Sequence, residues 1–210
     1  MDLLMIFFSS FLIALSGAMM PGPLLTAAIS EGARRGFIAG PLLIVGHGIL
    51  ELALVAALLL GLAPYLQKGE VFVAIALAGA AILLWMAFGM FRSLPSLSLA
   101  LETGEGKRGN LVLTGILLSA LNPYWVIWWA TVGLAYILHS RQFGLAGISF
   151  FFAGHILADF AWYSAVTGAV GRGRRFLSDG LYRAIIGGCA VLLVFFAGYF
   201  FHAGLQKLFS

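Results

Sequence analysis

The chain has 210 residues, of which 62% are hydrophobic and 10% are charged, and its mean hydropathy is +1.04. A soluble domain is usually about 45–50% apolar and about 25% charged, so this composition excludes a soluble globular domain and predicts an all-α integral membrane protein. The net charge of +4 comes from scattered basic residues without a basic stripe, so nucleic acid is not expected as a partner.

Six apolar segments are long enough to cross a bilayer, which requires about 20 residues per helix. They cover residues 3–30, 37–62, 71–91, 111–138, 145–170 and 184–205. The first segment has only Asp2 before its apolar run and is too long for a signal peptide, so we expect it to be a retained helix.

The first segment contains the run Pro21-Gly22-Pro23. Each proline removes an amide donor and clashes with the preceding turn, which predicts a helix break. Broken backbone at membrane depth occurs where it lines a cavity or is buried in protein. The helix that resumes from Leu24 should begin with unpaired amides, and such ends attract anions.

The second segment carries a histidine and a carboxylate four residues apart, His47 and Glu51, with Gly46 directly before the histidine. On a helix this spacing places the imidazole and the carboxylate on one face, one turn apart. Carboxylates are costly in hydrocarbon and usually face the interior of a helix bundle or a water-filled path. The pair therefore predicts a polar site inside the bundle.

After the third segment, residues 93–110 form a polar stretch that we interpret as a cytoplasmic linker between residues 1–92 and residues 111–210. The fourth segment carries Asn122, Pro123 and Tyr124, which predict a second helix break with unpaired amides from Tyr124 onward.

Three tryptophans follow this second break at helical spacing: Trp125, Trp128 and Trp129. They share one helix face, where we expect lipid contact or packing in preference to stacking against a substrate. Glycines beside the polar motifs and in the third and sixth segments, Gly46, Gly154 and Gly188 among them, are expected to let helices approach closely.

The fifth segment repeats the motif of the second, with Gly154, His155 and, four residues after the histidine, Asp159. The two histidines are 108 positions apart, and Gly79 and Gly188 are 109 apart. Three helices that begin on one side of a membrane end on the other, so a second set of three would run in the opposite sense. The pattern predicts two inverted three-helix repeats, an arrangement of many secondary transporters. The two helix breaks are 102 positions apart and depart from this register.

Basic residues are distributed unequally between the loops. Nine Lys and Arg residues lie in the loops after the first, third and fifth segments, and three lie on the other side, Lys68, Arg141 and Lys207. Since short cytoplasmic loops are enriched in basic residues, both termini are predicted to be extracytoplasmic. The single cysteine, Cys189, excludes an intramolecular disulfide and a cysteine-based metal cluster.

These residues together resemble the lysine exporter superfamily, the LysE/RhtB type of amino-acid efflux protein. The resemblance covers the whole chain and includes the Pro-Gly-Pro run in the first of six spans and Asn122-Pro123 in the fourth. Many members have a lysine where this chain has Tyr124, and the paired His and acid motifs look like a feature of a subgroup. The resemblance implies export of amino acids or related small solutes, driven by the proton gradient or by exchange.

We interpret the chain as a proton-coupled exporter of an amino acid or similar small zwitterion in a prokaryotic inner membrane, with no cofactor. Its expected partners are the solute, protons and lipids, and the sequence leaves open whether it forms a homo-oligomer. The expected substrate- and proton-binding residues are His47, Glu51, His155, Asp159, Pro21, Gly22, Pro23, Asn122, Pro123 and Tyr124.

The rival interpretation is a divalent transition-metal exporter, because two imidazoles and two carboxylates also suit an N₂O₂ metal site. A third hypothesis, an intramembrane enzyme or structural subunit, is disfavoured by the lack of a nucleophile–base arrangement and by the buried acids, which a scaffold would not need.

Overall fold

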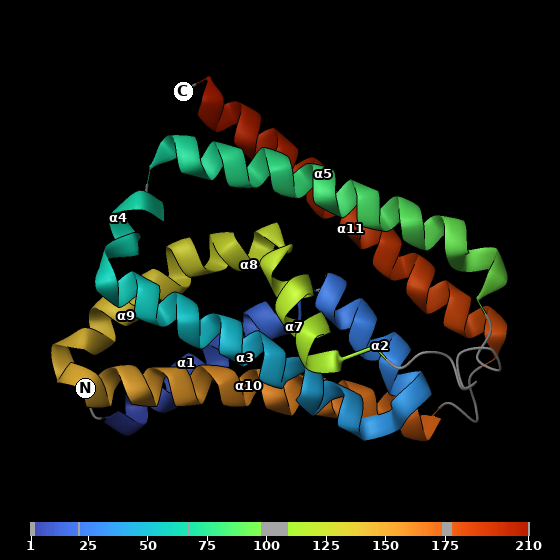
Figure 1. Cartoon of the computed structure of the whole chain (residues 1–210), viewed down its shortest axis with the longest axis horizontal. Coiled ribbons are helices and arrows are strands. Elements are labelled where there is room, and N and C mark those ends of the chain that lie inside the picture. The colour runs from blue at the N-terminus through green and yellow to red at the C-terminus, as the bar shows by residue number, and fades with distance from the viewer. Residues whose placement is uncertain (1–2, 21, 67, 98–108, 174–177, 210) are drawn as a thin grey trace.

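The computed structural model describes residues 3–20, 22–66, 68–97, 109–173 and 178–209, which form helices joined by short turns, without a β-strand (Figure 1). The first half contains α1 (Leu3–Ala18), α2 (Pro23–Arg35), η1 (Gly36–Ile38), α3 (Ala39–Ala57), η2 (Leu58–Leu62), α4 (Ala63–Leu66), α5 (Gly69–Ser93) and η3 (Leu94–Ser96). The second half contains α7 (Leu111–Ala120), α8 (Pro123–Trp128), η4 (Trp129–Gly133), α9 (Leu134–Ser140), η5 (Arg141–Phe143), α10 (Gly144–Gly173) and α11 (Asp179–Leu208). The predicted all-α fold is confirmed for these residues.

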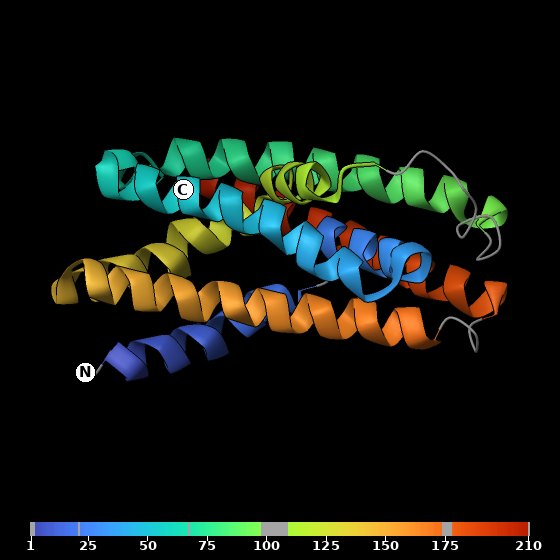
Figure 2. The ribbon, with the colours of Figure 1, turned by 60° about the horizontal axis from the view of Figure 1, so that its bottom comes forward.

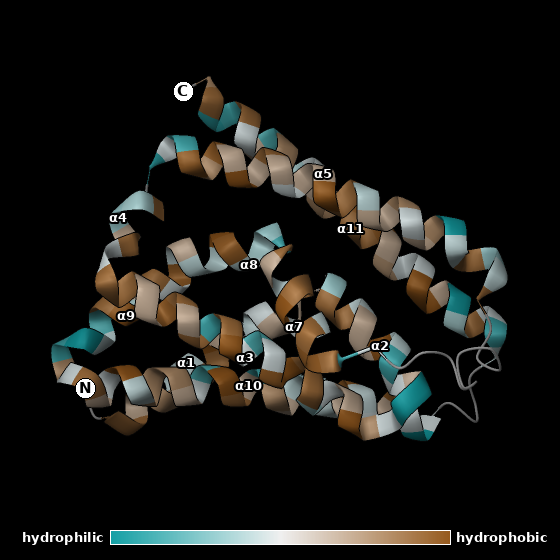
Figure 3. Ribbon diagram, viewed as in Figure 1, coloured by the Kyte–Doolittle hydropathy of each residue, from teal (hydrophilic) through white to brown (hydrophobic). Residues whose placement is uncertain are grey.

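Four helical stretches are long and apolar enough to cross a membrane: Pro23–Leu66, Gly69–Ser96, Pro123–Gly173 and Asp179–Leu208. Two further apolar helices, Leu3–Ala18 and Leu111–Ala120, are shorter, because the breaks separate them from the helices that follow. Figure 3 shows that apolar residues run along most of these helices. Large apolar side chains such as Trp85 on α5 and Phe195 on α11 are 72% and 65% exposed, as expected of surfaces that lipid covers.

Helices are interrupted at both places where the sequence predicts a break. The first helix of each pair ends at Ala18 or Ala120, and the second begins at Pro23 or Pro123. Proline fits the first helical position because an amide there would have no partner within the helix. Pro21 lies outside the described residues.

The helices pack in pairs that join the two halves of the chain. α5 lies along α11, α1 along α10, and α3 along α7. Figure 2 shows α1 running beneath α10, with α5 in a separate layer above them. The breaks after α1 and α7 lie near the middle of the molecule (Figure 1).

Two of these helix pairs depend on the glycine that directly precedes the histidine of each motif. A Cβ at Gly46 of α3 would collide with the backbone carbonyl of Val112 in α7, and one at Gly154 of α10 would collide with the carbonyl of Phe7 in α1. Glycine therefore permits the close backbone approach at both contacts, as expected. The same expectation is wrong for Gly188, whose added Cβ would have no neighbour within 4 Å.

Candidate functional site

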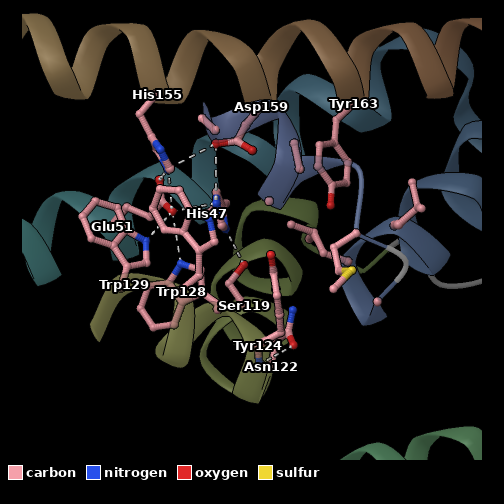
Figure 4. A pocket seen from close by; sticks show the side chains of 18 residues that line it. His47, Glu51, Ser119, Asn122, Tyr124, Trp128, Trp129, His155, Asp159 and Tyr163 are labelled. Atoms are coloured by element: carbon pink, nitrogen blue, oxygen red, sulfur yellow. Dashed lines mark hydrogen bonds and ion pairs between the residues drawn. The ribbon is translucent and has the colours of Figure 1, made fainter. Parts of the chain in front are cut away.

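The two motifs of histidine and acid, 108 positions apart in sequence, meet in one buried cluster (Figure 4). α3 supplies His47 and Glu51, and α10 supplies His155 and Asp159. All four side chains are buried, since the most exposed residue, His47, is only 7% accessible. One nitrogen or carboxylate oxygen from each residue lies within 4.8 Å of those of the other three.

Glu51 lies at the centre of this cluster and is surrounded by donors. Its Oε1 is 2.9 Å from Nε2 of His47 and 3.1 Å from Nε2 of His155. The indole N–H groups of Trp129 and Trp125 donate to the same oxygen at 2.8 and 3.1 Å. A buried carboxylate is tolerated when hydrogen bonds and opposite charge compensate for its lost hydration, and Glu51 has both.

Asp159 is compensated less well than Glu51. Its Oδ2 lies 3.8 Å from Nε2 of His47 and 3.6 Å from Nε2 of His155, and this buried oxygen accepts no hydrogen bond. Since an unsatisfied buried polar atom is costly, Asp159 is the group of the cluster with most to gain from a proton or another cation.

Two different environments orient the imidazole rings. The hydroxyl of Ser119 on α7 donates to the carbonyl of Gly115 at 2.7 Å, so its oxygen is the acceptor for Nδ1–H of His47, also at 2.7 Å. This contact directs Nε2 of His47 towards Glu51. The ring of His155 instead packs against Trp128 and Trp129, with ring centroids 5.0 and 5.2 Å away, and its Nδ1 has no hydrogen-bond partner.

The tryptophans contact the cluster, which sequence reasoning did not predict. Of the two roles expected for them, packing is confirmed and lipid contact is wrong for Trp128 and Trp129, which are 7% and 0% exposed and belong to a buried core cluster. Trp129 begins the π-helical segment η4, and such segments are frequent at functional sites. The sequence could have predicted this contact, because an indole N–H only donates hydrogen bonds and a buried carboxylate such as Glu51 needs donors.

A cavity of about 50 Å³ borders the cluster, which is room enough for water, since one molecule needs about 10–15 Å³. The four clustered residues line it together with residues at both helix breaks, among them Met20, Gly22, Asn122 and Tyr124. The cavity thus connects the two features that the sequence predicts separately. Tyr163 of α10 and Ser119 also face it (Figure 4).

The two helix starts at this cavity differ. Gly22 provides no side chain to cap α2, whose second and third residues, Leu24 and Leu25, line the cavity. At α8 the side chain of Asn122 accepts from the amide of Tyr124 at 3.1 Å. The prediction of an unpaired amide is therefore wrong at Tyr124, because Asn122 is an N-cap residue.

Pro23 and Pro123 do not line this main cavity. Pro23 is buried and borders a smaller neighbouring cavity, which it shares with Gly22, Asn122 and Tyr124. Pro123 is buried where α8 meets α5, and a Cβ on Gly79 of α5 would collide with it. Both prolines therefore shape the breaks without facing the polar cluster.

Comparison with known proteins assigns the chain to a family. The pattern of the LysE type translocator family matches residues 15–204. The chain belongs to this family. The translocator is also 34% identical over 202 residues to the chemotactic transduction protein ChpE of Pseudomonas aeruginosa, covering 93% of this chain and 97% of that protein. No solved structure matches it.

Membership confirms the resemblance predicted from the helix breaks and the six apolar segments. The translocator is a multi-pass membrane exporter with a small-molecule substrate, and its family consists of transporters rather than enzymes. Within this translocator, the cavity beside His47, Glu51, His155 and Asp159 is the candidate site for that substrate.

Proposed function

We propose that the translocator is a secondary-active, proton-coupled exporter of an amino acid or a similar small zwitterion in a prokaryotic inner membrane. The observation that carries the proposal is the lining of the cavity, which combines the carboxylates of Glu51 and Asp159 with the uncapped start of α2. A helix start attracts an anion and the carboxylates attract a cation, so the two together suit the two charges of a zwitterion.

The proposed solute places its ammonium group against Asp159, the less compensated acid, and its carboxylate near the amides of Leu24 and Leu25. A proton and an ammonium group would compete for the same carboxylate. If the proton binds from one side of the membrane and the solute from the other, the proton displaces the solute and the solute displaces the proton. This exchange is what an antiporter requires.

We propose that the fold comprises six spans arranged as two inverted repeats, residues 1–92 and 111–210, joined by residues 93–110. The helix pairs support this arrangement. In such a repeat α1 corresponds to α7, α3 to α10, and α5 to α11. The contact of α1 with α10 then corresponds to that of α7 with α3, and α5 and α11 contact each other. The glycines that precede the two histidines occupy equivalent places, Gly154 against α1 and Gly46 against α7.

Thermal-shift measurements on the purified protein test the proposed solute class. At least one free amino acid should raise the unfolding temperature, because a ligand that binds only the folded state stabilises it. The N-acetyl and the carboxamide derivatives of that amino acid each lack one charge and should give no shift. His47→Gln and His155→Gln should retain this shift and change the pH optimum of export. Stabilisation by both derivatives as strongly as by the parent amino acid would contradict recognition of a zwitterion.

Reporter fusions test the proposed orientation. A fusion at Ser210 should show extracytoplasmic activity and one within residues 93–110 cytoplasmic activity, because nine of the twelve Lys and Arg residues lie in the loops assigned to the cytoplasm. A fusion beside Lys68, in a loop assigned to the outside, serves as the matched control. The opposite pattern at all three positions would reverse the topology.

A further inference from the structure

The buried cluster has the spacing of a tetrahedral metal site. Nε2 of His47 lies 2.9 Å from Oε1 of Glu51 and 3.8 Å from Oδ2 of Asp159. Nε2 of His155 lies 3.1 Å from Oε2 of Glu51 and 3.6 Å from the same Oδ2 of Asp159. Ligand atoms at about 2.0–2.1 Å from a tetrahedral Zn²⁺ lie about 3.3 Å from one another. The distances of the cluster lie on both sides of that value.

Each acid has an oxygen that hydrogen bonds leave free. The indoles of Trp125 and Trp129 hold Oε1 of Glu51, while its Oε2 accepts no hydrogen bond. Oδ2 of Asp159 is likewise buried without a hydrogen bond. Two free carboxylate oxygens therefore lie beside two imidazole nitrogens in a site that excludes bulk water.

The contact of His47 with Ser119 fixes the ring form that binds metals. Because Ser119 accepts from Nδ1–H, it is Nε2 of His47 that faces Glu51, 2.9 Å from Oε1. When a metal ion displaces the proton at Nε2, the lone pair of that nitrogen becomes the ligand. Metal-binding histidines commonly donate their other N–H to such a partner, which sets both the tautomer and the ring orientation.

We propose that His47, Glu51, His155 and Asp159 together bind one divalent transition-metal ion of the Zn²⁺ class, with one atom from each residue (Figure 4). Two imidazoles favour Zn²⁺, Co²⁺ or Ni²⁺ over Mg²⁺ and Ca²⁺, which prefer oxygen ligands alone. The inference uses the same four residues as the proposed function. The ion occupies the place assigned there to the ammonium group, so metal and solute exclude each other.

Co²⁺ titration of the full-length protein, purified without a polyhistidine tag, tests this inference. Tetrahedral Co²⁺ absorbs visible light much more strongly than octahedral Co²⁺, so the spectrum reports geometry as well as binding. We expect one Co²⁺ per chain with a tetrahedral spectrum, displaced by an equivalent of Zn²⁺. A wild-type protein that shows no tetrahedral spectrum overturns the proposal, whatever the variants do.

Variants locate the ion within the molecule. His47→Gln and His155→Gln should abolish the tetrahedral spectrum, whereas Ser119→Ala, a change in a positioning residue, should weaken Co²⁺ binding about 10- to 100-fold with the spectrum retained. His202→Gln is the matched control, because His202 is exposed on α11, and it should bind as the wild type does. Loss of binding in the His202 variant alone, or unchanged binding in both cluster variants, would place the ion elsewhere and overturn the proposal.

No solute and no proton gradient enter these measurements. Failure to bind Co²⁺ or Zn²⁺ would leave the export proposal intact. Failure of every amino acid to stabilise the protein would contradict the export proposal without affecting the metal site.

Discussion

Asp159→Asn should reduce proton-coupled export roughly a hundredfold or more, because losing one partner of a buried charge pair in a binding site costs about 2–5 kcal/mol of binding free energy. Asparagine keeps the shape of the side chain and one acceptor oxygen, but it cannot carry a proton or a negative charge. Folding should be largely preserved, because Oδ2 of Asp159 accepts no hydrogen bond that the change would remove. Solute uptake into inverted vesicles at several pH values, beside the yield of folded protein, measures both effects.

Glu51→Gln should abolish coupled export as well, for a related reason. Its amide oxygen can still accept from Trp125 and Trp129, but the charge that faces the two imidazoles is lost. Glu70→Gln is the matched control, since Glu70 is an exposed carboxylate in the first turn of α5. Full pH-dependent export by both the Glu51 and the Asp159 variants would remove these acids from the transport mechanism.

The second large effect is expected at the contact between α3 and α7. Gly46→Ala places a methyl group against the backbone carbonyl of Val112, which cannot move aside as a flexible side chain could. Overpacking of a tight contact typically costs about 1–3 kcal/mol, so the variant should unfold at a clearly lower temperature. Because Gly46 directly precedes His47, the same displacement should also open the polar cluster and reduce export.

Cys189 provides the readout for this experiment. It is the single cysteine of the chain and is buried, so a thiol-reactive fluorescent dye reports unfolding at one known position. Gly198→Ala on α11 is the control, because a Cβ there meets no atom within 4 Å. Alanine stabilises a helix by about 1 kcal/mol relative to glycine, so the control should unfold at the same temperature or slightly higher. Equal unfolding temperatures for Gly46→Ala and Gly198→Ala would show that the close contact is not needed.

Composition and local pattern by themselves determined the class of the protein, the helix breaks and the pairing of each histidine with its acid. A chain this apolar must satisfy its backbone hydrogen bonds internally, which in hydrocarbon favours helices. The position of Pro23 and Pro123 sets where helices restart, because proline has no amide to donate. The spacing of His47 to Glu51 and of His155 to Asp159 follows from the helical repeat alone.

Only the tertiary structure decided which faces of these helices meet. The contacts of Glu51 with Trp125 and His155 join residues 74 and 104 positions apart, and the contact of His47 with Ser119 joins residues 72 apart. A local pattern cannot specify such contacts, because they depend on how the glycines let α3 approach α7 and α10 approach α1. Packing between helices therefore decided which donors surround Glu51 and left Oδ2 of Asp159 without a hydrogen bond. Helical periodicity fixes which residues share a face, but it does not determine what that face contacts.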